Sequence, residues 1–368
     1  MPPKLCRWGI MGSAVIAQKN WQAIVNSGNG IVTAVASREP SKAASFIEDR
    51  QRECPFSAAP AACTYDELLA RDDVDAVYIP LPTGLRAPWV IKAAEAGKHV
   101  LCEKPCATSV AELREMLAAC AANNVQFMDG VMFMHSQRMP AIRAALDDKS
   151  NIGDLRRISS HFSFRAPDDF LQNNIRMSSQ LEPHGCLGDL GWYCIRFALW
   201  TMQYQMPLEV TAHMLSQQGR PDSPDAVPME LSAEIFFPGD VSFGFYCSFL
   251  VAQQQTVTLS GSQGYLHVPD FVLPFFGSDV GFEVVNHDFE IRGCQFNMAT
   301  YPRRISVKEY SNNHPTSQET NLFRKFAELA LGRQPDPAWG DVALRTQIVL
   351  DACLASARGG GRPVKLSS

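Results

Sequence analysis

The sequence predicts an α/β protein of two parts, and three observations support this prediction. Up to about residue 130, short apolar runs alternate with stretches of helical periodicity, which is typical of a parallel sheet covered by helices on both faces. After about residue 150, apolar and polar residues alternate one by one, as in antiparallel strands that bury one face. The chain of 368 residues is also long enough for two hydrophobic cores. We therefore expect a doubly wound domain at residues 1–130 and, at residues 131–368, an α/β domain with an open, mostly antiparallel sheet.

The first part shows a regular succession of strands and helices. Gly28 is placed to close the first helix, and Ser109 with Glu112 three residues later has the pattern of a capping box for the last one. The strands are predicted at 5–11, 31–37, 76–80, 99–102 and 125–128, and the helices at 16–26, 42–49, 65–71, 88–96 and 110–123.

The second part begins with a change of rhythm. In the run VSFGFYCSF from residue 241, every second residue is apolar, so these side chains share one face of a strand. The Pro-Gly-Asp run before it marks a turn to a partner strand at 234–237. The resulting sheet has one face free to pack on helices or on another subunit. Further strands are predicted at 156–164, 208–215, 255–260 and 265–268, and helices at 189–201, 320–331 and 341–357.

Composition argues against several classes of protein. Hydrophobic residues make up 46% and charged residues 19%, an ordinary globular balance, and the formal net charge of −5 argues against a nucleic-acid partner. No apolar run approaches the roughly 20 residues of a membrane-spanning helix, and we expect no secretory leader. The 11 cysteines include no C-x-x-C pair. We therefore expect free thiols in a cytoplasmic protein, and no metal site.

The turn after the first strand reads WGIMGSAVIAQKN at residues 8–20 and is a candidate dinucleotide site. Such a site needs a tight turn so that backbone N–H groups and a helix N-terminus can face a pyrophosphate. Gly12 matches the first glycine of G-x-G-x-x-G, whereas Ala14 and Ala17 occupy the other two positions. A purely structural glycine turn is the alternative. If a nucleotide binds, Gly12, Ser13, Ala14 and Ile16 are the expected contacts.

The end of the second strand indicates which nucleotide would bind. An NAD site usually places a carboxylate there, which accepts a hydrogen bond from the ribose 2′-hydroxyl. This chain has Ser37 and Arg38 at that place and Lys42 on the next helix. A hydroxyl and a guanidinium suit a 2′-phosphate, so the pattern favours NADP over NAD. A solvated basic loop is the alternative.

The run GKHVLCEKPCA at residues 97–107 places Glu103-Lys104-Pro105 at the exit of a buried strand. That exit lies on the carboxyl edge of the sheet, where open α/β folds bind ligands, so we expect Lys104 to point into the crevice beside a nicotinamide. Pro105 would fix the backbone there. A surface ion pair is the alternative. On the same edge, Pro80, Leu81, Pro82 and Glu103 are expected to contact the cofactor.

The run PHGCLGDLGWYCIRFALW at residues 183–200 supplies a second group of polar side chains. Asp189 and Tyr193 are four residues apart and therefore share one face of a helix. A phenol and a carboxylate on one face are what a carbonyl/alcohol redox site requires, namely a proton donor and a group that orients the substrate. The alternative is a structural helix in which Asp189 serves as a cap.

These motifs resemble those of the Gfo/Idh/MocA oxidoreductases, and most closely the NADP-using branch with dihydrodiol and D-xylose dehydrogenases. The resemblance lies in WGIMGSAVIA, AVASR, AGKHVLCEKPCA, DGVMFMHSQR and LGDLGWYCIR. It implies an NADP-binding Rossmann domain at 1–130 and a substrate-binding and oligomerisation domain at 131–368, whose open sheet face commonly forms the oligomer contact. It also implies that Lys104 and Tyr193 act at the substrate, with Asp189 beside them.

Two positions depart from the family pattern. Many members have P-N-x-x-H after the third strand, whereas this chain has Pro82-Thr-Gly-Leu-Arg86, and an arginine cannot act as an acid or base there. The usual glycine triplet before the catalytic helix reads Pro183-His184-Gly185. A pocket role and a structural role for His184 are both open. The candidate substrate contacts are Arg86, His135, Arg176 and His184.

Together these patterns predict an NADP-dependent oxidoreductase that acts on a sugar, a cyclic polyol or a related hydroxylated ring. Lys104, Asp189 and Tyr193 form the expected catalytic set. The alternative is a non-catalytic NADP(H)-binding sensor or regulator of the same fold, which would be free to lose that set. We expect a small-molecule substrate, no nucleic acid, no membrane, and a homo-oligomer (dimer or tetramer) that forms through the open sheet face.

Overall fold

The computed structural model describes residues 4–332 and 334–366, which divide into two compact units. Unit 1 comprises residues 1–135, 180–183 and 312–348, and unit 2 comprises residues 136–179, 184–311 and 349–368. The chain thus returns to unit 1 twice after residue 135. None of the helices in the described part combines the length and the apolar character of a membrane crossing.

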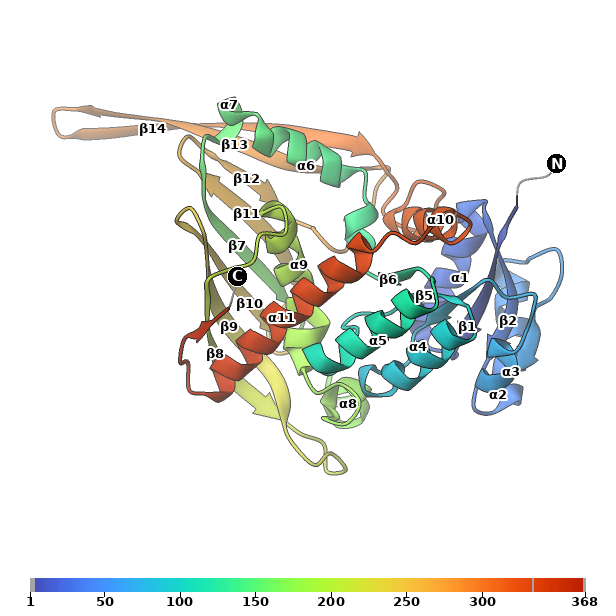
Figure 1. The fold of residues 1–368 in the computed structure, drawn as a ribbon. Coiled ribbons are helices and arrows are strands. Elements are labelled where there is room, and N and C mark those ends of the chain that lie inside the picture. Colours follow the sequence, from blue (N-terminus) through green and yellow to red (C-terminus); the bar gives the residue numbers. More distant parts are fainter. Residues whose placement is uncertain (1–3, 333, 367–368) are drawn as a thin grey trace. The chain divides into compact units, whose positions relative to one another are not determined.

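Unit 1 contains a six-stranded parallel sheet with the order β3-β2-β1-β4-β5-β6 (Figure 1). This is the doubly wound order with a switch point between β1 and β4, where the crossovers reverse direction. The parallel sheet predicted for this part is confirmed. Its strands are β1 (Cys6–Met11), β2 (Gly30–Ala36), β3 (Ala61–Cys63), β4 (Ala76–Ile79), β5 (His99–Cys102) and β6 (Phe127–Asp129).

Helices cover both faces of this sheet. One face packs on α1 (Val15–Ser27), α2 (Pro40–Glu53) and α10 (Gln318–Ala330), and the core residue Trp8 contacts the rings of Phe323 and Phe326 on α10. The C-terminal part of the chain therefore completes the core of the N-terminal unit. The remaining helices of unit 1 are α3 (Tyr65–Leu69), η1 (Thr83–Leu85), α4 (Arg86–Glu95), α5 (Val110–Ala122) and η2 (Met132–His135).

Unit 2 contains a nine-stranded sheet with the order β14-β13-β12-β11-β7-β10-β9-β8-β15. All neighbours are antiparallel except β10 and β7, so the expectation of a mostly antiparallel sheet is confirmed. The strands are β7 (Leu155–Ser163), β8 (Glu209–Gln218), β9 (Val227–Phe237), β10 (Val241–Ser248), β11 (Gln254–Gly261), β12 (Tyr265–Val268), β13 (Asp279–Arg292), β14 (Gln295–Lys308) and β15 (Val364–Lys365).

The two faces of this sheet differ in composition. The apolar residues predicted to alternate on β10 are buried, as are Ile158 on β7 and Leu259 on β11. The opposite face, which we call the open face, carries half-exposed polar groups such as the Arg157–Glu234 ion pair and Thr258, which contacts His267. The helices of unit 2 are α6 (Arg138–Asp147), α7 (Lys149–Ile152), α8 (Asp168–Asn173), η3 (Ile175–Met177), η4 (Leu187–Gly191) and α9 (Trp192–Thr201); α11 (Ala338–Arg358) runs from unit 1 into unit 2.

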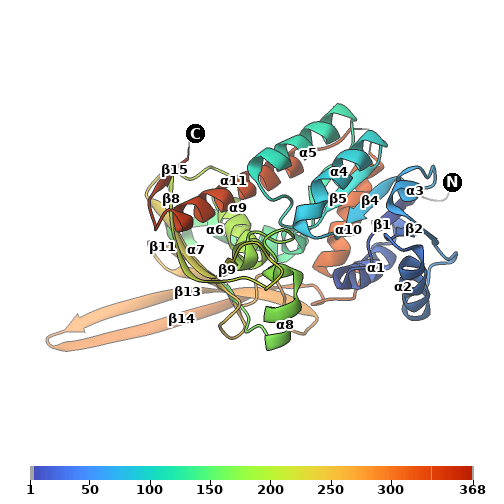
Figure 2. The same ribbon diagram turned by 90° about the horizontal axis from the view of Figure 1, so that it is seen from below.

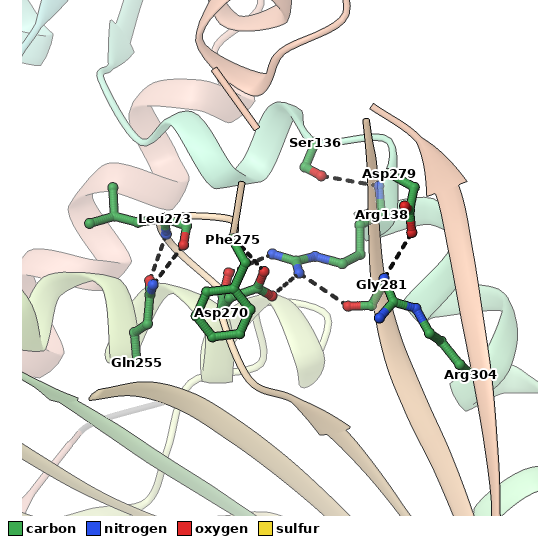
Figure 3. A network of polar contacts seen from close by, with 9 residues as sticks. All are labelled: Ser136, Arg138, Gln255, Asp270, Leu273, Phe275, Asp279, Gly281 and Arg304. Atoms are coloured by element: carbon green, nitrogen blue, oxygen red, sulfur yellow. Dashed lines mark hydrogen bonds and ion pairs between the residues drawn. The ribbon is translucent and has the colours of Figure 1, made fainter. Parts of the chain in front are cut away.

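A buried ion pair fixes the loop between β12 and β13 (Figure 3). The guanidinium of Arg138 pairs with the Asp270 carboxylate and also donates to the carbonyl oxygens of Asp270 and Gly281, at 2.9 and 3.1 Å. The side-chain amide of Gln255 exchanges two hydrogen bonds with the backbone of Leu273, each 2.6 Å long. Buried charges must be paired in this way to offset their desolvation. Residues 270–275 are therefore held at two points.

Three local differences from the prediction have simple causes. Strand β3 was not predicted, because it is an Ala-rich run of three residues without the β-branched side chains that mark a strand. The helix predicted to begin at Asp189 starts two residues earlier with the π-helical turn η4. Ser109 caps α5 as predicted, but the Glu112 half of the predicted capping box differs, since its carboxylate accepts hydrogen bonds from the backbone and hydroxyl of Thr108. The largest feature that the sequence analysis did not predict is the hairpin of β13 and β14.

Candidate active site

The carboxyl ends of β1, β2, β4 and β5 lie at one edge of the parallel sheet in unit 1, and the predicted cofactor contacts follow these strands directly. Gly12 has φ +115°, a conformation that favours glycine, and a Cβ built on it would lie 3.3 Å from a methyl group of Leu81. The turns after β1 and β4 therefore meet across the switch point. The structure places Gly12 beside Leu81, so the turn that contains Ser13, Ala14 and Ile16 and the turn that contains Pro80 and Pro82 lie at the same sheet edge.

The N-terminus of α1 is free of side-chain caps. Ala14 is the N-cap residue and has ordinary extended backbone (φ −65°, ψ 153°), so this position does not need glycine for its conformation. Val15 is 81% exposed. An apolar, exposed first turn without a capping side chain leaves backbone N–H groups available to an anion. The geometry of this turn fits a pyrophosphate.

The three residues predicted to contact a 2′-phosphate differ in their surroundings. Ser37 is buried, and its backbone N–H donates to the Cys63 carbonyl at 3.1 Å. Lys42 pairs with Glu39 at 2.9 Å, and this hydrogen bond lowers the pKa of the Glu39 carboxyl. Arg38 is exposed and makes no hydrogen bond or ion pair with the described part of the chain. Arg38 is therefore the side chain best suited to a 2′-phosphate.

A buried chain of hydrogen bonds holds Glu103. The Asn20 side-chain amide donates to the phenol oxygen of Tyr78 at 2.6 Å, and that phenol donates to Glu103 Oε1 at 2.6 Å. Burial, followed by the Glu103 charge, raises the pKa of Tyr78 well above its usual value, so the phenol stays a donor. The other Glu103 oxygen accepts from the Lys104 backbone N–H at 3.2 Å. This chain fixes the backbone on the N-terminal side of Lys104.

Arg86 fixes the same loop from the other side. Its guanidinium is 4% exposed, and it donates to the carbonyl oxygens of Leu81 at 2.6 Å, Glu103 at 2.8 Å and Pro105. The Lys104–Pro105 peptide is cis. The carbonyl oxygens on both sides of Lys104 thus accept hydrogen bonds from the Arg86 guanidinium, whose planar set of N–H donors can bind several acceptors at once. The predicted contact between Arg86 and a substrate stays a prediction; the hydrogen bonds shown are to backbone.

A short segment of unit 1 docks on the loop after β4. The Glu182 carboxylate accepts from the backbone N–H of Thr83 at 3.0 Å and from its hydroxyl at 2.6 Å. Gly84 donates to the Leu181 carbonyl at 2.9 Å, and a Cβ at Gly84 would lie 2.0 Å from the Gln180 carbonyl oxygen. Only glycine permits this approach. The contact anchors the residues that directly precede His184, and the sequence separation of 99 residues hid it from sequence reasoning.

In unit 2, the catalytic candidates lie on η4 and α9. A π-helical turn is wider than an α-turn, and such turns are frequent at functional sites. Asp189 on η4 pairs with Arg176 at 2.7 Å, so a permanent cation faces this carboxylate. Tyr193 is 8% exposed and its ring packs on Phe162 at 5.8 Å. The structure therefore brings together Asp189 and the pocket candidate Arg176.

Each of the two candidate histidines has an aromatic or an acidic neighbour. In unit 1, the ring of His135 stacks on Trp339 at 5.0 Å. In unit 2, His184 is 2% exposed, and its Nε2 lies 3.7 Å from Asp351. Burial lowers the pKa of His184 to about 4, so this imidazole is neutral at physiological pH. No described residue hydrogen-bonds to its Nδ1. The contact of His135 and His184 with a substrate stays a prediction.

Sequence reasoning missed the side chains that support Lys104. Tyr78 lies in an apolar strand, and a tyrosine in such a place needs a polar partner. That signal was present, but its partner cannot be read from the chain. Arg86 was predicted as a departure from a family pattern and as a substrate contact, but not as a support for the loop of Lys104. Glu182 carried no signal, because nothing in its neighbourhood points to Thr83.

Comparison with known proteins assigns the family. The model of the oxidoreductase family with an NAD-binding Rossmann fold, GFO_IDH_MocA, matches residues 6–131, and the GFO/IDH/MocA C-terminal domain matches residues 141–267. An uncharacterized oxidoreductase from Rhizobium meliloti is 30% identical over 261 residues, 70% of this chain and 73% of that protein. The chain belongs to the Gfo/Idh/MocA oxidoreductase family, as its motifs predict.

Several relatives have named activities. The dTDP-3,4-didehydro-2,6-dideoxy-alpha-D-glucose 3-reductase of Streptomyces violaceoruber is 39% identical over 195 residues, 52% of this chain and 53% of that enzyme. The trans-1,2-dihydrobenzene-1,2-diol dehydrogenase of Mus musculus is 29% identical over 271 residues, 73% of this chain and 76% of that enzyme, in agreement with the predicted branch. The chain spans about half the length of the first of these relatives.

A solved structure extends the similarity to the whole chain. The 3-ketoreductase KijD10 from Actinomadura kijaniata, in complex with NADP and TDP-benzene, has a TM-score of 0.78 and 25% identity, and the match covers 98% of each chain. Variants of that enzyme with one tyrosine or one lysine replaced have also been solved. Both units of this protein therefore have the family fold.

Proposed function

We propose that this protein is an NADP-dependent oxidoreductase that moves a hydride between the nicotinamide and a carbon of a sugar, cyclic polyol or related hydroxylated ring. One observation carries the proposal: Lys104 lies on a loop held on both sides, at the sheet edge that also bears the uncapped turn after β1. Relatives with named activities reduce or oxidise a keto-sugar and a cyclic diol, which supports a ring substrate.

The residues of this chain transfer the proton, stabilise charge and orient the substrate. When bound, the nicotinamide supplies or accepts the hydride. Tyr193 exchanges a proton with the substrate oxygen, and the Lys104 ammonium stabilises negative charge that develops there. Asp189, paired with Arg176, orients substrate hydroxyls. His184 and His135 are further proposed contacts.

A spectrophotometric screen tests this proposal directly. Purified protein is mixed with NADP⁺ or NADPH and a panel of pyranoses, inositols, diols and their keto forms, and the nicotinamide absorbance is followed. We expect turnover with at least one ring compound and a preference for NADP over NAD. Tight NADP(H) binding without turnover across the panel would contradict the enzyme and favour a sensor.

We further propose a homo-oligomer, dimer or tetramer, that forms through the open face of the sheet in unit 2. The half-exposed polar side chains of that face support this proposal. We also propose a reducing compartment, the cytoplasm, because all 11 cysteines are free thiols and burial raises the pKa of several of them, which makes them unreactive.

Arg38 should decide the choice of cofactor. We expect Arg38→Ala to weaken NADPH binding about 10-fold to 100-fold, the effect of one charge-assisted contact, and to leave NADH binding unchanged. Calorimetric titration of each nucleotide measures this. Lys42→Ala is the matched control with a smaller effect, because Glu39 already pairs with Lys42. Equal weakening for both nucleotides would contradict the assignment of Arg38 to a 2′-phosphate.

Arg86 should support Lys104 through the backbone. We expect Arg86→His to lower turnover at least about 10-fold and the free energy of unfolding by roughly 2 kcal/mol, because an imidazole cannot satisfy three buried carbonyls at once. Turnover assays and denaturant unfolding measure the two effects. Lys92→Gln, an exposed change on the same helix, should alter neither. An Arg86→His enzyme with normal turnover would show that the guanidinium does not position Lys104.

A further inference from the structure

The outer part of the hairpin β13–β14 is a two-stranded arm. Strand β12 pairs with β13 only as far as Val285, whereas β13 and β14 remain paired to Arg292 and Gln295. Figures 1 and 2 both show this hairpin projecting away from the rest of the sheet in unit 2. The side chains at positions 287–304 are all exposed. We call residues 286–301 the arm.

The arm has one apolar and one polar face. The register places Phe289 opposite Met298 and Ile291 opposite Phe296, so these four side chains share a face, and they are 61%, 68%, 56% and 72% exposed. The rings of Phe289 and Phe296 stack at 6.3 Å. The opposite face is polar, with the pairs Asp288–Ala299, Glu290–Asn297 and Arg292–Gln295.

The apolar face of the arm continues the open face of the sheet. Partners across a ladder share a face, and so do every second residues along a strand. Val285 lies opposite Tyr265, and Tyr265 opposite Ser260. Ser260 lies on the open face with Thr258, and Val285 lies on the same face as Phe289, four residues later on β13. One continuous surface thus combines the half-exposed polar sheet with an apolar extension at its β14 edge.

The exposed apolar face of the arm indicates that it packs against a partner. A two-stranded ribbon is at best marginally stable in water, and these four side chains leave roughly 400–500 Å² of apolar surface exposed. A stable interface buries about 800 Å² on each partner, more than the arm alone offers. A symmetric pair uses the same surface twice, so each copy contributes its arm and also receives the arm of the other. The area therefore favours a second copy of this chain, in contact with both the arm and the open face.

An exposed apolar side chain of the open face lies on the opposite side of the sheet from the arm. Phe236 on β9 is 42% exposed and lies on the open face, since it pairs with Ser242, the neighbour of Arg157 on that face. When two such sheets pack face to face about a two-fold axis along the strands, the β14 edge of one copy lies over the β8 edge of the other. Phe236 is then on the side of the sheet that faces the arm of the second copy.

We propose that the arm packs against the open face of a second copy of this chain, with Phe289, Ile291, Phe296 and Met298 buried at the edge of the sheet that bears Phe236 of the other copy. The inference rests on the proposed oligomer contact through the open face, and it names the segment that holds the pair together. It does not depend on the chemistry at Lys104 and Tyr193.

Sedimentation velocity over a concentration series tests the arm. We expect wild-type protein to dimerise, and Phe289→Ser with Phe296→Ser to raise the dissociation constant at least about 30-fold, because buried aromatic anchors dominate such interfaces. Phe236→Asp, on the open face at the edge that receives the arm, should also raise the constant. The matched control, Glu290→Gln with Asn297→Ser on the polar face, should leave the constant unchanged. Circular dichroism and the unfolding midpoint confirm that each variant folds.

Two results would overturn the inference in different ways. If the wild-type protein dimerises and the apolar-face variants have the same dissociation constant as the control, the arm does not contribute to the dimer, and the proposed open-face contact is unaffected. A wild-type monomer at all concentrations would remove both. Neither result bears on turnover, which is measured separately.

Discussion

Replacing Lys104 with methionine is expected to lower turnover at least 100-fold and to change NADP binding little. Methionine keeps the length and apolar stem of lysine but has no ammonium, so the loss isolates the charge. The loop should keep its shape, because Arg86 and Glu103, itself held by Tyr78, hydrogen-bond to the backbone around residue 104. Steady-state kinetics with the best ring substrate, together with NADPH titration, measure the two quantities.

The matched control for this change is Lys92→Met, which removes an exposed ammonium from α4. It should have wild-type turnover. If Lys104→Met were equally active, Lys104 would not act at the reacting oxygen. A loss of NADPH binding that accounted for the whole decrease would assign Lys104 to the cofactor instead.

Replacing Tyr193 with phenylalanine is expected to produce a loss of similar size. The change removes only the hydroxyl, and the ring that packs on Phe162 remains, so the packing of the ring should be unaffected. A decrease of two decades corresponds to about 2.7 kcal/mol of transition-state stabilisation, within the usual range for a positioned acid–base group. We expect kcat to fall and KM to change little, because the proton transfer occurs in the transition state.

Two comparisons strengthen the Tyr193 experiment. Tyr246→Phe removes a hydroxyl from the open face of the sheet and should be silent. The double variant of Lys104 and Tyr193 should lose little more activity than either single variant, because groups that act as a unit give non-additive losses. Fully additive losses would show that the two residues act at separate points.

The sequence predicted the elements whose residues repeat with a clear period. The strands that alternate apolar and polar residues, such as β10, and the helices with one apolar face were located to within a few residues. The order of strands and helices also implied the parallel sheet of unit 1, because βαβ units connect parallel neighbours. The candidate residues after β1, β2, β4 and β5 lie at one sheet edge for the same reason.

The remaining features depend on contacts between residues that are far apart in the sequence and cannot be predicted from it. Arg86 was predicted to contact a substrate, and its three carbonyl acceptors could not be read from the sequence, just as Glu182 contacts Thr83 from 99 residues away. The sequence analysis did not predict the arm, although apolar residues alternate on both sides of Gly293, which is the pattern of a hairpin. Such contacts follow from tertiary packing rather than from local pattern.

The central claim is that Lys104 and Tyr193 act on one oxygen of one substrate. A crystal structure of the protein with NADP and a bound cyclic polyol tests it most directly. We predict that the Lys104 ammonium and the Tyr193 phenol both lie within about 2.6–3.2 Å of the same substrate oxygen, whose carbon faces the nicotinamide. A complex in which the two groups lie on opposite sides of the nicotinamide ring, or in which only one of them reaches the substrate, would contradict the account.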